Sequence, residues 1–260
     1  MFAFHIFAIA LGLVLGSFLL TVAMRLQDGR SLLVRSHCES CSTNISVTGL
    51  IPVIGYLVQK GKCTHCGEKI SAVYPLVELI NAAIIWSIFS KTGIEAAFLH
   101  KLILFELFLL IAIIDFRTHL IFPQPVVIGL LVQTFWLLTF ENPGLLNSII
   151  GLFLGAGIFH WVSYLYFLVR KKEGLGSGDA TLLGLIGFVL GWKALFGVIF
   201  LASILGIVGG SIILLINRQS ISKEIAFGPW LSLSAFFIWR FAEQIQGLPF
   251  WFSGIDLSYF

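Results

Sequence analysis

Charged residues are scarce in this chain. They make up 11% of its 260 residues, whereas a soluble globular protein carries about 25%. Hydrophobic residues make up 58%, and the mean hydropathy is +1.00. One soluble core of this length cannot bury so much apolar surface. The composition therefore excludes an ordinary soluble domain and predicts an all-α polytopic membrane protein in contact with lipid. Because the net charge is only +3 and is spread over connecting loops, we expect no nucleic-acid partner.

Long polar stretches are almost as scarce, and residues 25–72 form the one sizeable example. The first apolar run is longer than that of a signal peptide and follows no basic residue, so we expect a retained first span. The predicted domains are a first transmembrane helix (1–24), a loop module (25–72) and a seven-helix transmembrane core (73–260). Because about 20 apolar residues cross a bilayer, we predict about eight transmembrane helices, at 3–24, 73–90, 96–115, 120–140, 145–169, 180–192, 194–216 and 225–245.

The few cations are divided unevenly between the predicted loops. With the N-terminus outside, twelve Lys and Arg residues fall on the inner side and four fall on the outer side. Cytoplasmic loops carry the excess of Lys and Arg in membrane proteins. The loop module is therefore predicted to face the cytoplasm.

Cysteine occurs only four times, always in the loop module, as two Cys-x-x-Cys pairs: Cys38 with Cys41, and Cys63 with Cys66. This spacing predicts a structural zinc site, in which four thiolates close a tetrahedron around Zn2+. Two disulfides or a redox dithiol are alternatives. Disulfides rarely persist in a reducing cytoplasm, however, and two pairs favour one shared ion. His37 and His65 adjoin these cysteines and are expected to be surface residues.

Small residues recur at a four-residue spacing in the later apolar runs. Such pairs allow two helix backbones to approach closely, and we interpret them as ordinary packing within a helix bundle. The pairs are Gly151 with Gly155, Gly187 with Gly191, and Gly206 with Gly210.

Ionisable residues inside apolar spans are costly, so each marks a functional site or a buried pair. Lys101 lies near the outer end of its span and is expected to reach the interface with its long side chain. Glu106 lies in the middle of the same span and must face the bundle interior. Glu78 is predicted to line a substrate cleft near the active face or to anchor the loop module.

Asp115 and Asp179 differ from these residues because both are placed at the cytoplasmic membrane face. Two carboxylates at one depth suit an aspartyl protease, where one takes a proton from attacking water and the other donates a proton. Helix dipoles favour Asp179 as the base and Asp115 as the acid. Gly174, Gly176 and Gly178 are expected to leave room for an extended substrate backbone and to permit positive φ angles. Taken alone, each aspartate also suits a loop residue or a helix N-cap.

These motifs occur together with several others, and the combination resembles the type IV prepilin peptidases, which are GxGD aspartyl peptidases and N-methyltransferases of bacterial inner membranes. The likeness covers roughly residues 11–235. It is carried by "LGSF" (15–18), "CESC" (38–41), "IPVIGYL" (51–57), "GKCTHCGEKISAVYPLVEL" (61–79), "IDFRTHLI" (114–121), "GLGSGDATLLGLIGFVLGW" (174–192) and "IAFGPWL" (225–231).

The resemblance implies a multifunctional enzyme of type IV pilus or type II secretion systems, multi-pass in the inner membrane with its active site facing the cytoplasm. It implies a protease, and hence a hydrolase, that cleaves the basic leader from a prepilin or pseudopilin partner after a glycine. Methylation of the new N-terminus with S-adenosylmethionine then follows. The family's catalytic residues map onto Asp115 and Asp179, and its zinc ligands map onto the four cysteines.

Some positions depart from the family pattern. Thr181 stands where a lysine is frequent, and the segment from Ile121 to Gln124 looks one residue longer or shifted. Further changes cluster in and beside residues 25–72, the part linked with methyl transfer. The sequence therefore favours peptidase activity over methyltransferase activity. The alternatives are a peptidase without methyl transfer, a catalytically silent paralogue in pilus assembly, and an ion or proton transporter with a zinc module.

Overall fold

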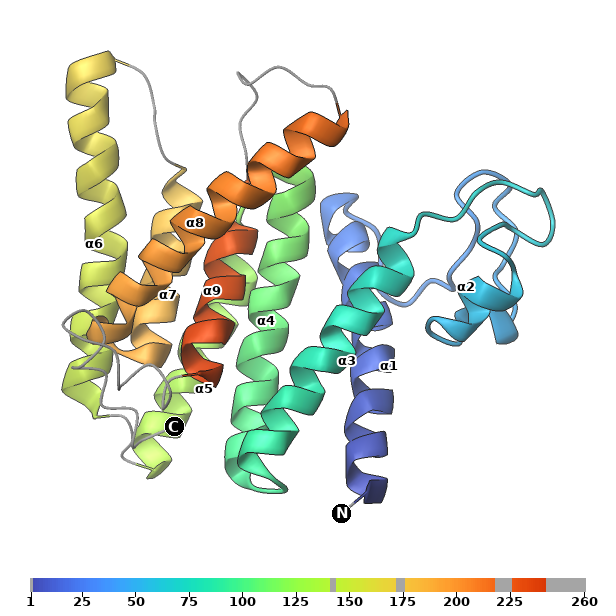
Figure 1. Ribbon diagram of the computed structural model, residues 1–260, viewed down its shortest axis with the longest axis horizontal. Coiled ribbons are helices and arrows are strands. Elements are labelled where there is room, and N and C mark those ends of the chain that lie inside the picture. The colour runs from blue at the N-terminus through green and yellow to red at the C-terminus, as the bar shows by residue number, and fades with distance from the viewer. Residues whose placement is uncertain (1, 141–143, 172–175, 218–225, 242–260) are drawn as a thin grey trace. The chain divides into compact units, whose positions relative to one another are not determined.

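The computed structural model describes residues 2–140, 144–171, 176–217 and 226–241 (Figure 1). Within these ranges the chain forms helices and turns without extended strands. The elements are α1 (Phe2–Gln27), the 3-10 helix η1 (Thr48–Leu50), α2 (Ile54–Val58), α3 (Val73–Thr92), α4 (Ala96–Thr118), α5 (Pro123–Phe140), α6 (Leu145–Arg170), α7 (Ser177–Leu190), α8 (Trp192–Asn217) and α9 (Gly228–Arg240).

Each of the eight predicted apolar runs contains a helix, which confirms the all-α membrane-protein class. Among the described residues, six helices are long and apolar enough to cross a membrane: α1, α3, α4, α5, α6 and α8. Helix α7 has 14 residues and α9 has 13. At about 1.5 Å per residue, α7 is about 21 Å long, whereas the hydrocarbon core is about 30 Å thick. The number of crossings therefore stays a prediction.

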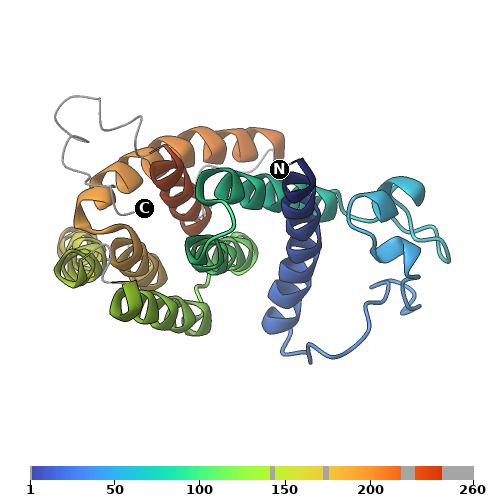
Figure 2. The ribbon, with the colours of Figure 1, turned by 90° about the horizontal axis from the view of Figure 1, so that it is seen from below.

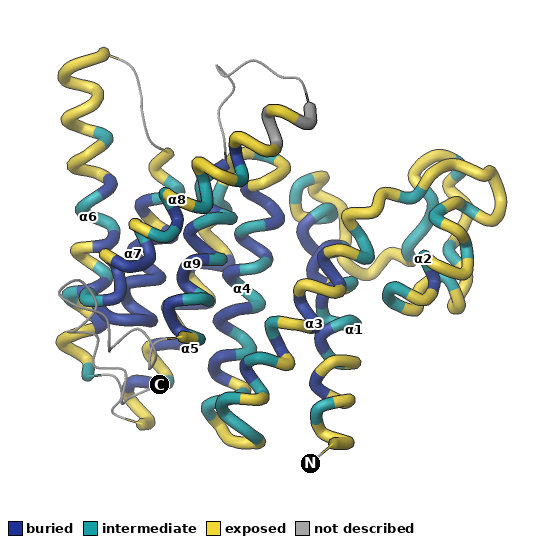
Figure 3. The backbone as a smooth tube through the Cα atoms, in the orientation of Figure 1, coloured by how far each residue is buried: buried dark blue, intermediate teal, exposed yellow. Residues whose placement is uncertain are grey.

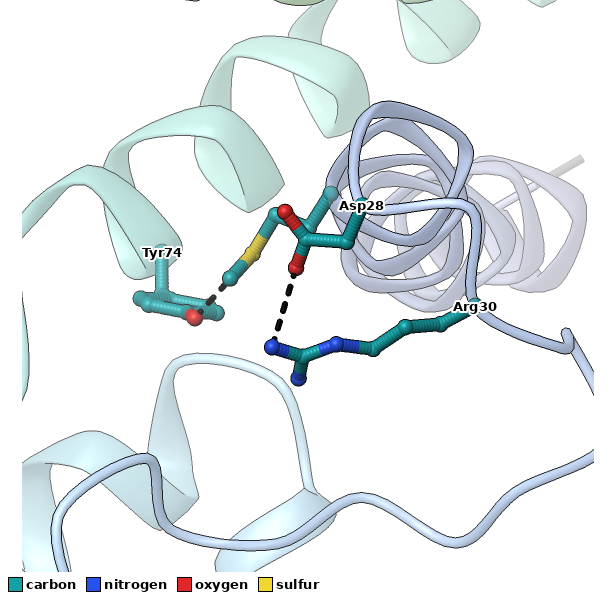
Figure 4. Close-up of polar contacts among 4 residues, drawn as sticks. Asp28, Arg30 and Tyr74 are labelled. Carbon is teal, nitrogen blue, oxygen red and sulfur yellow. Dashed lines mark hydrogen bonds and ion pairs between the residues drawn. The ribbon is translucent and has the colours of Figure 1, made fainter.

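The chain divides into two compact units, residues 1–102 and 103–260. In the first unit α1 packs along α3 (Figure 2). A Cβ atom at Gly12 would lie 2.5 Å from the Ala82 Cα atom, so only glycine permits this approach. The Asn81 amide donates a hydrogen bond to the Gly12 carbonyl at 3.0 Å. Near the C-terminal end of α1, the Tyr74 hydroxyl donates a hydrogen bond to the Met24 sulfur at 3.2 Å (Figure 4).

In the second unit α6 packs along α7, and α8 packs on α6, α7 and α9. Gly151 and Gly187 meet where these helices pack, because a Cβ atom on either glycine would collide with the carbonyl of the other. Gly155 lies equally close to the Leu183 carbonyl. The packing predicted for these three glycines is confirmed. Gly191 instead ends α7 with a φ of +80°.

Helix α7 is the most enclosed element of the second unit, and Figure 3 shows it buried beyond its first turn. Its residues from 182 to 190 are all buried. The loop module in the first unit is largely exposed. Lys101 differs from the expectation that its side chain extends out of the protein, because it is enclosed by protein at 4% exposure.

Candidate active site

Asp115 lies in the last turns of α4 and is only 4% exposed. Its Oδ2 atom accepts a hydrogen bond from the Gly228 backbone N–H at 2.9 Å. Gly228 is the first residue of α9, and Pro229 follows it. A Cβ atom at position 228 would lie 2.7 Å from that same oxygen. Only glycine can therefore bring this N–H against the carboxylate.

Asp179 lies in the first turn of α7. Its backbone N–H donates to the Gly176 carbonyl at 3.2 Å, which closes the turn that begins the helix. A Cβ atom at Gly176 would lie 3.5 Å from Asp179 Oδ2, an ordinary contact distance. Asp179 and Asp115 both line the same cavity. The two predicted catalytic residues are thus brought together, from positions far apart in the chain.

Both aspartates line one cavity of about 660 Å³ in the second unit. Its walls come from the end of α4, the α4–α5 turn, the second half of α6 and the start of α7. Besides the aspartates, its lining includes Ile121, Gly176 and Gly178. A cavity of this size admits water and a short peptide segment beside two carboxylates, as peptide hydrolysis requires.

The predicted glycines lie at this cavity, but they adopt other conformations than expected. Gly176 has a φ of −65°, and neither Gly176 nor Gly178 is among the residues with positive φ. A Cβ atom at Gly178 would lie 2.9 Å from the Ile121 Cβ atom, so this glycine lets α7 approach the α4–α5 turn. Gly174 lies outside the described residues. Clearance for a substrate backbone stays a prediction.

Gly228 is the site residue that the sequence did not reveal. Its motif, "AFGPWL", was noted as part of the family likeness, but no role was given to it. The structure shows that Asp115 faces the N-terminus of α9 just as Asp179 lies at the N-terminus of α7. Both carboxylates therefore meet the positive end of a helix dipole. Helix dipoles therefore do not distinguish the acid from the base.

The four cysteines form a cluster in the first unit, built from two similar turns. In the first turn the Cys38 N–H donates to the Thr43 carbonyl at 2.9 Å, and in the second the Cys63 N–H donates to the Glu68 carbonyl at 2.8 Å. The residue after each second cysteine, Ser42 or Gly67, has a positive φ. Each turn thereby points two sulfur atoms to one side.

The sulfur positions fit a single metal ion. All four Sγ atoms lie within 4.8 Å of one another. The Cys38–Cys66 separation is 3.8 Å and the Cys41–Cys63 separation is 4.0 Å. Sulfurs about 2.3 Å from a tetrahedral zinc ion would lie about 3.8 Å apart, whereas a disulfide needs about 2.05 Å. His37 instead makes a 3.2 Å hydrogen bond with the Arg35 carbonyl.

The thiols of this cluster differ in acidity. Hydrogen bonds from the Thr43 side chain and backbone lower the pKa of Cys41 to about 6. Backbone hydrogen bonds from Cys66 and His65 lower the pKa of Cys63. The pKa of Cys66 is raised to about 12, despite a backbone hydrogen bond from Glu68, because desolvation and the other sulfurs disfavour a further thiolate.

Glu78 is buried on α3 and contacts the loop module. Its Oε2 atom accepts a hydrogen bond from the Val53 N–H at 2.7 Å. Val53 has a φ of +60°, which a β-branched residue rarely adopts. The bond therefore supports a strained turn at the start of α2 and is consistent with the predicted anchoring role. A place for Glu78 in the substrate cleft stays a prediction.

Two family models match the chain, one after the other. The Bacterial Peptidase A24 N-terminal domain matches residues 10–92, and the Type IV leader peptidase family matches residues 102–211. The first match contains the cysteine cluster, and the second contains both aspartates. No solved structure gives a significant match.

Curated relatives agree with these matches over nearly the whole chain. A protein of Pseudomonas aeruginosa is 31% identical over 97% of this chain and 95% of its own length. One of Myxococcus xanthus is 30% identical over 95% of this chain and 75% of its own length. One of Bacillus subtilis is 29% identical over 90% of this chain and 93% of its own length. All three are named prepilin leader peptidase/N-methyltransferase. With its paired aspartates and its clustered cysteines, this chain belongs to the type IV leader peptidase family and is a peptidase.

Proposed function

We propose that this protein is an aspartyl endopeptidase that removes the leader of type IV prepilins or pseudopilins at the cytoplasmic face of a bacterial inner membrane. The observation that carries the proposal is the shared cavity of Asp115 and Asp179. A transporter would instead need ionisable groups along a path across the membrane. Here the two acids meet at one end of their helices.

In the proposed mechanism one carboxylate accepts a proton from water as the water oxygen attacks the scissile carbonyl. The other carboxyl group donates its proton as the carbon–nitrogen bond breaks and the amine leaves. The Gly228 N–H occupies Oδ2 of Asp115, so Oδ1 is the oxygen we assign to proton transfer. Asp179 lines the same cavity from the first turn of α7. Because both carboxylates face helix N-termini, we assign the acid and base roles to the pair rather than to single residues.

The substrate class follows from the membrane setting of the cavity. A prepilin has a basic leader before its cleavage point and an apolar helix after it. That helix can remain in the bilayer while the scissile bond lies beside the aspartates. The inner-side excess of cations predicted from the sequence supports this orientation.

We also propose that Cys38, Cys41, Cys63 and Cys66 hold a structural zinc ion. Its support is the sulfur spacing, which agrees with tetrahedral thiolate coordination. Bound there, zinc would supply a cross-link between the two cysteine turns. The residues of the module would otherwise bury little apolar surface, because most of them are exposed.

Methylation of the new N-terminus is a second proposed activity. The names of the relatives, which include N-methyltransferase, favour it. S-adenosylmethionine would supply the methyl group to the amine nitrogen that cleavage releases.

The decisive test compares leader removal by the wild-type protein with removal by Asp115→Asn and Asp179→Asn, using a prepilin that retains its leader. We expect cleavage by the wild type and its loss in both variants. Asp28→Asn, which changes an exposed carboxylate, serves as the matched control and should cleave normally. Normal cleavage by either active-site variant would refute the paired mechanism. Mass spectrometry of the product with the methyl donor present would show whether its mass rises by one methyl group.

A further inference from the structure

A short apolar segment with arginine at both ends follows the first membrane helix. We call residues 30–35, Arg-Ser-Leu-Leu-Val-Arg, the anchor segment. Leu33 is 96% exposed, Val34 is 53% exposed and Leu32 is 49% exposed. Three consecutive apolar side chains in water are unfavourable, because each could be stabilised by transfer to an apolar surrounding.

The anchor segment is tied back to the end of α1. The Arg25 guanidinium donates to the Leu32 carbonyl at 2.5 Å, and the Arg30 N–H donates to the Arg25 carbonyl at 2.9 Å. Arg30 also pairs with Asp28 at 3.3 Å (Figure 4). The Arg25 side chain therefore holds Leu32 and the adjacent Leu33 close to the end of α1.

Helix α1 is long and apolar enough to cross the bilayer, and its end would then mark a membrane boundary. Apolar side chains held there can enter the zone between headgroups and acyl chains, while adjacent arginines remain at the phosphates. The loop module as a whole carries six Lys and Arg residues against three carboxylates. Anionic lipids attract such basic segments next to a membrane helix.

We propose that the anchor segment is a lipid-binding site, in which Leu32, Leu33 and Val34 insert among the headgroups of the bilayer that α1 crosses. Arg30 and Arg35 bind the phosphates of anionic phospholipids. The exposed Asp28–Arg30 pair does not prevent this, because exposed ion pairs are weak and exchange partners readily. Cys38 follows Arg35 by three residues, so the lipid contact holds the first cysteine turn close to the membrane surface.

Lipid fits this segment better than a protein occupant does. A basic leader peptide would be repelled by the two arginines, whereas an anionic headgroup satisfies them. The proposal requires only that α1 spans the membrane, so it can be tested without any measurement of catalysis.

The test places a photo-crosslinking amino acid, p-benzoylphenylalanine, at position 33 of the full-length protein in nanodiscs that contain phosphatidylglycerol. A second variant carries it at the exposed Asn44 in the same loop module, as the matched control. A third carries it at Leu138, an exposed apolar residue of α5, as the lipid-contact reference. After illumination, intact-protein mass spectrometry measures the fraction that has gained one phospholipid.

We expect the lipid adduct at position 33 to approach that at position 138 and to exceed that at position 44 several-fold. Adding Arg35→Gln, or replacing phosphatidylglycerol with phosphatidylcholine, should reduce the adduct at position 33 but leave that at position 138 unchanged. A yield at position 33 no higher than at position 44 would overturn the proposal. Crosslinks from position 33 to this chain or to a second copy in place of lipid would overturn it as well. Gel filtration of each variant confirms that it is folded.

Discussion

Asp115 depends on a glycine that lies 113 residues later in the chain. The backbone N–H of Gly228 fixes one carboxylate oxygen, and any side chain at that position would collide with it. We expect Gly228→Ala to displace the carboxylate and to lower kcat/KM for leader cleavage by about 100-fold, the loss that a misplacement of about 1 Å can cause. The measurement is a steady-state cleavage assay.

The matched control for this change is Gly157→Ala. Gly157 lies on α6, and a Cβ atom there would meet no atom within 4 Å. Its kcat/KM should equal that of the wild type. Equal activity in both variants would show that Gly228 does not position Asp115.

Glu78 supports a turn whose backbone is strained. Glu78→Leu removes the acceptor of the half-buried Val53 N–H, and leaving a fully buried donor unpaired costs about 1–3 kcal/mol, so the cost here is at the low end of that range. We expect the loop module of this variant to open more often, which limited proteolysis would report as faster cleavage within residues 25–72. Glu78→Gln keeps an acceptor oxygen and should be cleaved at nearly the wild-type rate. If protease cleaves both variants at the same rate, the hydrogen bond does not hold the loop module closed.

The sequence predicted the aspartate pair but missed its glycine partner. Asp115 and Asp179 were visible because charges at the ends of apolar runs are rare. The requirement for glycine at position 228 arises from the distance between two helices, which no local pattern encodes. The conformations of Gly176 and Gly178 differed from the prediction for a related reason: Gly178 is needed for the approach of Ile121 and not for a positive φ.

At the scale of elements, the packing of α6 on α7 sets the position of Asp179. Gly151→Ala would place a methyl group against the Gly187 carbonyl. Overpacking of this kind costs about 1–3 kcal/mol, so we expect a lower thermal midpoint in detergent. Gly157→Ala, on the same helix but in open space, should leave the midpoint unchanged. Equal midpoints for the two variants would contradict the close contact.

The cysteine turns make a second prediction at this scale. Cys66→Ser removes one of four ligands, and we expect its zinc content, measured by elemental analysis, to fall from one ion per chain to a small fraction. His65→Ala changes the adjacent side chain and should retain the metal. Loss of zinc from the His65 variant but not from the Cys66 variant would refute the four-thiolate site.

The long helices were predictable because each needs an apolar run, and runs of this length are seldom ambiguous. The short elements η1 and α2 were not predicted. Local hydrogen bonds hold them: the Gly49 N–H of η1 donates to the Ser46 hydroxyl, and the Val53 N–H before α2 donates to Glu78 on α3. No periodic pattern encodes such bonds. Lys101 was misjudged because its position near a helix end says nothing of the neighbours that enclose it.

At the scale of the whole molecule, bilayer thickness should influence catalysis. Helix α7 is about 9 Å shorter than a typical hydrocarbon core is thick, and mismatch costs fractions of a kcal/mol per Å. We expect kcat/KM for leader cleavage to fall in liposomes of longer-chain phospholipids, with Asp179 drawn deeper below the headgroups.

The same liposomes provide the control for this prediction, because activity measured after dissolving them in detergent should no longer depend on chain length. A cleavage rate that is constant across all chain lengths would show that α7 does not experience the mismatch.

The short length of α7 also affects how water reaches the aspartates. A hydrolase consumes one water molecule for each bond it cuts, and a full-length helix would carry its first turn out to the headgroups. In the proposed membrane setting, a short α7 would leave its first turn recessed, and the 660 Å³ cavity in front of that turn would hold water below the membrane surface. A prepilin could then be hydrolysed there without leaving the lipid.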